Sequence, residues 1–160
     1  MKAFMDKDFM LQSATAQHLY HDYAAAMPIC DYHCHIPPRE IYENRRFENI
    51  AQVWLGGRNP DGSYFGDHYK WRVMRSNGVP EEYITGDKPD RERFQKFAEA
   101  LPMAIGNPMY HWTNLELHVF FGYDGVLNGD TAEEVWNLCN DKLQHDPKLT
   151  VRGLIEQSNV

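Results

Sequence analysis

The chain has 160 residues, of which 42% are hydrophobic, 13% aromatic and 24% charged, a composition typical of a globular domain with a real core. The formal net charge of −7 argues against nucleic acid as the main partner, because phosphate binding needs a basic face. No run of about 18 apolar residues occurs, so no membrane span is expected, and the first residues predict no signal peptide. Three cysteines without a CxxC pair favour a reducing, cytoplasmic setting.

The first predicted helix follows Ser13 or Thr15, either of which can cap its start. Its apolar and aromatic side chains recur at helical spacing on one face: Ala16, Leu19, Tyr20, Tyr23 and Met27. Pro28 ends this pattern, because proline cannot continue a helix.

Residues 29–33 are the only segment that we predict to be a buried strand, and they lead into His33 and His35. Side chains alternate along a strand, so these two imidazoles would share a face and could bind one divalent metal, for which zinc is suitable. On a helix they would point about 200° apart. Chance also produces isolated HxH pairs, and Asp31 on the same face could be a third ligand, orient a ligand or close a structural hydrogen bond.

Helical patterns dominate the rest of the chain. The predicted segments are 49–55, 68–77, a helix start at 80–82, 90–101, starts marked by capping boxes at Thr113 and Thr131, and 150–157. The glycine-rich stretch 56–66 is predicted to be a surface insertion, with a lid over a site as the alternative. A lone strand cannot satisfy its own backbone groups, so either a partner strand is missed or the chain is part of a larger fold.

A second dense group of polar and aromatic residues occupies 68–72. His68 and Tyr69 could hydrogen-bond a polyol or move a proton, and Arg72 or Arg75 could bind a carboxylate with two parallel hydrogen bonds. The structural alternative is a helix start with packed aromatic rings and solvated bases.

Six segments of the sequence resemble the uronate isomerase (glucuronate isomerase) family of the amidohydrolase superfamily: 4–9, 19–24, 31–35, 66–72, 75–79 and 105–112. The resemblance extends from the first residues to Val160. The HxH pair is common to the whole superfamily, whereas the segments around His68 and Asn107 are longer and more specific.

The resemblance implies an α/β fold in which this chain, itself mainly α-helical, is the N-terminal portion of a distorted TIM barrel. Residues 1–160 would be the N-terminal part of a single metal-dependent-hydrolase-like barrel domain, with a lead-in helix and barrel strand 1 in 1–38 and a helical excursion in 39–160. A TIM barrel takes about 250 residues. We therefore interpret the chain as a fragment that lacks the later metal ligands and the strand-8 aspartate base, and that is inactive alone.

The activity implied by the resemblance is cytoplasmic interconversion of D-glucuronate with D-fructuronate, and of D-galacturonate with D-tagaturonate. His33 and His35 would bind a divalent metal, usually zinc. His68 and Tyr69 would face the substrate, with Tyr69 polarising a carbonyl or shuttling a proton and His68 donating a hydrogen bond, and Arg72 would help to bind it. The expected partner is a small uronate rather than a nucleic acid or a membrane, with a homo-oligomer left open.

Two alternatives to this activity are kept. A hydrolase of the same superfamily would use the metal to activate water. A non-catalytic helical module would retain the motif and melt cooperatively without dependence on metal.

Overall fold

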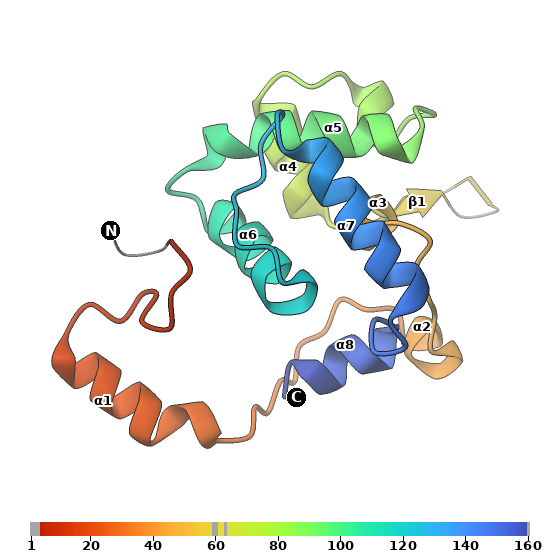
Figure 1. Cartoon of the computed structure of the whole chain (residues 1–160). Coiled ribbons are helices and arrows are strands. Elements are labelled where there is room, and N and C mark those ends of the chain that lie inside the picture. The colour runs from red at the N-terminus through yellow and green to blue at the C-terminus, as the bar shows by residue number, and fades with distance from the viewer. Residues whose placement is uncertain (1–3, 59–60, 63, 160) are drawn as a thin grey trace. The chain divides into compact units, whose positions relative to one another are not determined.

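The computed structural model describes residues 4–58, 61–62 and 64–159, and it divides into two compact, mainly helical units (Figure 1). The first unit combines the chain up to Arg45 with the chain from Val151 onward, and the second unit is Arg46–Thr150. None of the helices within these described ranges has the length and apolar character that a membrane span requires.

The first unit contains four helical elements: α1 (Ala14–Asp22), the 3₁₀ turn η1 (Ala24–Ala26), α2 (Pro38–Glu43) and α8 (Val151–Gln157). Ser13 rather than Thr15 caps α1, because its hydroxyl accepts a hydrogen bond from the Ala16 N–H at 3.1 Å. Helices α2 and α8 pack together, and Arg152 donates from its side chain to the carbonyl oxygens of Ile41 and Tyr42 at the end of α2. A cation at that end is favourable, because the last carbonyls of a helix lack partners.

The predicted strand at residues 29–33 is wrong for this chain, since the segment forms neither a helix nor a strand. Its backbone makes one hydrogen bond to a distant residue, from Ile29 N–H to the Asn159 carbonyl at 3.2 Å, which is too little for a ladder. The Ile29 side chain is 54% exposed, so the segment is not buried either. A strand needs a neighbouring strand that accepts and donates backbone hydrogen bonds along its length. Among the residues described here, no strand lies beside residues 29–33.

The second unit contains the larger core. Its elements are α3 (Ile50–Trp54), β1 (Gly57–Arg58), β2 (Tyr64–Phe65), α4 (His68–Ser76), η2 (Glu81–Tyr83), α5 (Asp90–Ala100), η3 (Leu101–Ala104), α6 (Pro108–Phe121) and α7 (Ala132–His145). Helix α5 packs against α3, α4 and α7 (Figure 1). Phe94 and Phe97 of α5 are fully buried, and both rings lie within 6.0 Å of the Trp54 ring.

The helix predictions in this unit are largely confirmed, and their differences have local causes. The glycine-rich stretch 56–66 contains the β1–β2 hairpin, in which Gly57 pairs with Phe65. The capping box at Thr113 is wrong, because α6 starts earlier, at an Asn107 cap whose side chain accepts from the Met109 N–H. Thr131 does precede α7, but it makes no side-chain cap.

Candidate functional site

The HxH pair forms the first cluster of predicted site residues, in the first unit. The Nε2 atoms of His33 and His35 lie 2.7 Å apart, so one of them donates to the other. The Asp31 carboxylate accepts a hydrogen bond from the His33 backbone N–H at 3.0 Å. Of the three roles considered for Asp31, this contact corresponds to the structural hydrogen bond. The two imidazoles converge although the backbone around them is not a strand.

The two converging imidazoles meet only part of what a metal ion requires. Two imidazole nitrogens bound to one tetrahedral zinc ion at about 2.1 Å lie about 3.4 Å apart. The His33 and His35 nitrogens, which lie 2.7 Å apart, would have to separate by about 0.7 Å to bind it. No group of three or more His, Cys, Asp or Glu side chains suited to a metal occurs within 4–58, 61–62 and 64–159. The pair therefore fits as two ligands of a cation and not as a complete site.

The second cluster lies at the start of α4, in the second unit. Asp67 caps this helix, with Oδ1 accepting from the Tyr69 N–H at 2.8 Å. The rings of His68 and Tyr69 lie 4.2 Å apart, centroid to centroid, and Tyr69 is 49% exposed. The cap fixes the first turn of the helix, so both side chains project from a rigid element toward solvent.

A groove of about 400 Å³ joins this helix to the segment 103–109. Tyr69 and Arg72 line one side, and Asn107 and Met109 line the other. The Arg72 guanidinium carbon lies 5.8 Å from the centre of the Tyr69 ring, and within the described part of the chain this guanidinium makes no ion pair. The groove thus combines a phenol, an uncompensated cation and a polar amide, which are groups that can bind a hydroxylated acid.

A charged group centred on the buried Lys70 lies beneath the same helix, and the sequence reasoning missed it. Lys70 is only 5% exposed, and its ammonium lies 3.0 Å from Asp67 Oδ2 and 3.9 Å from Glu116 Oε1. Glu116 also accepts a hydrogen bond from the Trp54 indole N–H. Burial raises the pKa of the Glu116 carboxyl, while the Lys70 charge acts in the opposite direction. The spacing of Asp67 and Lys70 hints at a local pair, but nothing in the sequence shows that Lys70 is buried.

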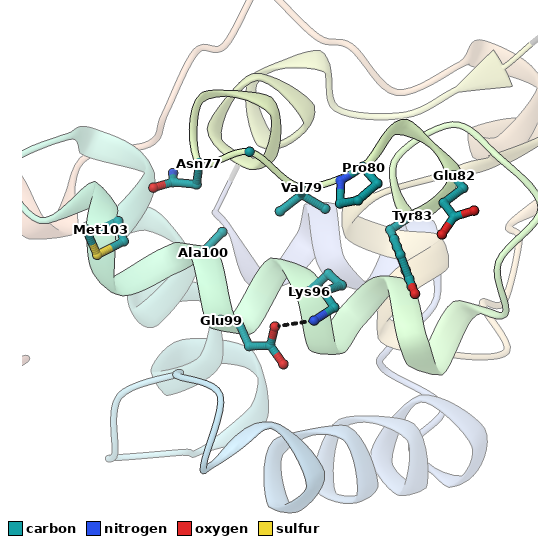
Figure 2. A pocket seen from close by; sticks show the side chains of 10 residues that line it. Asn77, Val79, Pro80, Glu82, Tyr83, Lys96, Glu99, Ala100 and Met103 are labelled. Atoms are coloured by element: carbon teal, nitrogen blue, oxygen red, sulfur yellow. Dashed lines mark hydrogen bonds and ion pairs between the residues drawn. The ribbon is translucent and has the colours of Figure 1, made fainter.

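A second hollow, of about 600 Å³, lies along α5 in the same unit (Figure 2). It is lined by Tyr83, Glu82 and the ion pair of Lys96 with Glu99, whose atoms lie 2.7 Å apart. None of the predicted site residues lines it, and its charged groups already have partners, since Lys96 pairs with Glu99 and Glu82 pairs with Lys88 outside the hollow.

The structure therefore places the predicted site residues in two clusters, each described within its own unit. His33 and His35 converge in the first unit. In the second unit, Tyr69 and Arg72 share a groove, and the His68 ring lies against the Tyr69 ring at a tilt of 33°. The groove also joins residues from the two segments that carry the most specific sequence resemblance, 66–72 and 105–112.

The comparisons with known proteins all point to the same family of enzymes. The family model described as glucuronate isomerase matches residues 1–160. The uronate isomerase of Lachnospira eligens is 70% identical over 160 residues, and that of Lachnoclostridium phytofermentans is 59% identical, each match covering 100% of this chain and 32% of the relative. The crystal structure of uronate isomerase from Thermotoga maritima matches with a TM-score of 0.85 at 33% identity, covering 99% of this chain and 32% of that one.

A glucuronate isomerase structure from Caulobacter crescentus has a TM-score of 0.79 at 23% identity, which shows similarity of fold alone. The chain thus spans about a third of the length of the relatives and structures that it matches.

Proposed function

The chain belongs to the glucuronate isomerase family, and from this we propose that the complete protein interconverts D-glucuronate with D-fructuronate, and D-galacturonate with D-tagaturonate. We further propose a cytoplasmic role in sugar-acid catabolism, and a distorted TIM barrel of the amidohydrolase superfamily as the complete fold. The observation that carries the proposal is the groove at α4, where a phenol and an unpaired guanidinium face a mainly apolar segment that contributes the polar side chain of Asn107.

The residues of the groove suit the two ends of a uronate. The Arg72 guanidinium, which has no carboxylate beside it in the described residues, would hold the substrate carboxylate through charge-assisted hydrogen bonds. Tyr69 and His68 would contact the hydroxyl and carbonyl oxygens at the other end, because their rings lie together on the first turn of α4.

Aldose–ketose isomerisation moves a proton between C2 and C1 through an enediolate. It needs a base, a group that polarises the carbonyl oxygen, and anchors for the rest of the sugar. Tyr69 is the group that we assign to the oxygen, because its hydroxyl can donate a hydrogen bond to developing negative charge or pass a proton along. His68 supplies a second donor to the sugar.

His33 and His35 would hold a divalent cation, with zinc as the first candidate, since their Nε2 atoms converge. When bound, such a cation would polarise a substrate oxygen. The further ligands and the base that removes the C2 proton are expected outside this chain, which spans 32% of its relatives.

The test is turnover by the complete protein that contains this chain, with D-glucuronate in D₂O. Isomerisation forms a ketose and can exchange the C2 proton, whereas a hydrolase does neither. Tyr69→Phe should lower kcat by about 100-fold or more, because removing a proton-transferring group typically costs 10²–10⁴-fold. Tyr42→Phe is the control, since that side chain is 81% exposed on α2. Unchanged turnover in Tyr69→Phe would contradict the role of Tyr69, and absence of the ketose with the parent protein would contradict the function.

A further inference from the structure

We infer that Lys70 is a positioning residue for the groove, an inference that rests on the proposed function. Its ammonium, held between Asp67 and Glu116, fixes the first turn of α4 and thereby the orientation of Tyr69. Lys70 itself does not line the groove.

The connection to Tyr69 runs through a single carboxylate. Asp67 accepts from the Tyr69 backbone N–H with Oδ1 and from the Lys70 ammonium with Oδ2. An N-cap that is held from its other oxygen cannot rotate away from the helix without breaking both bonds. The Lys70 charge therefore restrains the cap, and the cap restrains the backbone from which the Tyr69 side chain projects.

The other side of Lys70 is tied to two neighbouring helices. Glu116 of α6 lies 3.9 Å from the ammonium and also accepts from the indole of Trp54 in α3. The Lys70 ammonium lies 5.8 Å from the centre of the Trp54 ring, an additional cation–π contact. Since α6 begins at the opposite wall of the groove, the ion pair between Lys70 and Glu116 links the helices that form its two sides.

The location of Lys70 distinguishes it from an ordinary surface lysine. It is 5% exposed, so its charge is kept away from water and needs its acidic partners. Removing the cation leaves Asp67, which is 30% exposed, free to hydrate and to adopt another rotamer. Loss of the restraint on the cap, rather than loss of a substrate contact, is then the main consequence, and it should lower kcat more than it raises KM.

The test compares three variants of the complete enzyme. Lys70→Met keeps nearly the length of the side chain without its charge, and Lys70→Arg keeps the charge. Lys96→Met removes a lysine from a more exposed pair of the same i,i+3 spacing that lies outside the groove. We expect Lys70→Met to lower kcat by about 10- to 100-fold, because small displacements of a positioned group have effects of that size. KM should change by less than about threefold. Lys70→Arg should keep most of the turnover, and Lys96→Met should match the parent.

Amide hydrogen exchange gives a second measurement that needs no activity. In Lys70→Met the Tyr69 amide should lose protection, while amides in the middle of α7 keep theirs. Equal loss of turnover in Lys70→Met and Lys70→Arg would assign the effect to packing and overturn the inference, as would unchanged kcat or unchanged exchange at Tyr69. If Lys70→Met does not fold, Glu116→Gln is measured instead, because it keeps an acceptor for the indole and removes the charge, and it must lower kcat for the inference to hold.

If the parent enzyme forms no ketose, the proposed function has failed, and hydrogen exchange alone decides whether Lys70 restrains the start of α4.

Discussion

Arg93 should contribute more to the stability of the second unit than any other charged residue described here. It lies on α5, is only 5% exposed, and donates to the carbonyl oxygens of Gly56, Leu55 and Ile84 at 3.1, 3.3 and 2.9 Å. It also donates to Asp90 Oδ1 at 3.0 Å. One guanidinium thus joins α5 to the end of α3 and to the turn after η2.

The cost of replacing Arg93 with methionine can be worked out in two ways. Four hydrogen bonds at about 1 kcal/mol each give roughly 4 kcal/mol. Breaking a buried ion pair by removing one partner typically costs about 3–5 kcal/mol. The Leu55 carbonyl keeps a donor, the Trp71 indole, which reduces the loss slightly. We therefore expect Arg93→Met to lower the free energy of unfolding by about 3–4 kcal/mol, a large share of the roughly 5–15 kcal/mol of an ordinary domain.

Urea unfolding of the chain, followed by tryptophan fluorescence, measures this loss directly, because all four tryptophans lie in the second unit. Arg91→Met is the matched control on the same helix. Its guanidinium donates to the Gln95 side chain and lies over the Trp136 ring, so about 1 kcal/mol or less is expected. If Arg93→Met does not fold, Arg93→Lys, which keeps the charge but cannot reach all these acceptors, should show an intermediate loss. The reasoning is refuted if Arg93→Met loses no more stability than Arg91→Met.

Three further results are expected. Gly56→Ala should lower the melting temperature more than Gly78→Ala. Both glycines have φ near +70°, so alanine at either position adds backbone strain of about 1 kcal/mol. Only at Gly56 would the new Cβ also lie 1.8 Å from a carbonyl oxygen of β2. Burial raises the pKa of Cys139 to about 12, so alkylation of the folded chain followed by mass spectrometry should label the other two cysteines and spare this one. Arg75 lowers the pKa of Glu81 to about 2, so the stabilisation that the ionised Glu81 provides is complete above pH 4.5 and is lost as the pH falls toward 2. The unfolding midpoint of Glu81→Gln should therefore fall less across this pH window than that of the parent chain. An identical fall in both would refute the pairing of Glu81 with Arg75.

The start of α6 shows what a local motif can and cannot predict. Thr113 and Glu116 have the spacing of a capping box, yet Thr113 is fully buried in the middle of the helix. The true start has its own signals, an asparagine cap followed by Pro108 in the first turn. A four-residue motif says nothing about whether its backbone N–H groups are already bonded within a longer helix. Pro108, which can only occupy a first turn without penalty, was the stronger signal.

The segment around His33 shows a different limit. The alternation rule predicted that His33 and His35 would share a face, and their Nε2 atoms do converge. The rule also implied a strand, which is wrong here, because a ladder requires a partner that the local sequence cannot supply. Side-chain convergence depends on a single intervening residue, Cys34, whereas strand formation depends on the rest of the fold. Local patterns therefore predict side-chain convergence far better than strand formation.

The same distinction explains why the local sequence does not reveal the burial of Lys70 and why its position matters. Asp67 and Lys70 are three residues apart, so their pairing is local, but the burial of Lys70 is produced by Trp54 and Glu116, which come from two other helices. Helix α4 is consequently held on one face by the buried Lys70 and its half-buried acidic partners, while Tyr69 and Arg72 remain exposed on another face. Burying a charge is unfavourable unless it is compensated, so an apolar side chain would serve simple packing at least as well. A charge kept in that place is better explained by the geometry that it imposes on the first turn of α4.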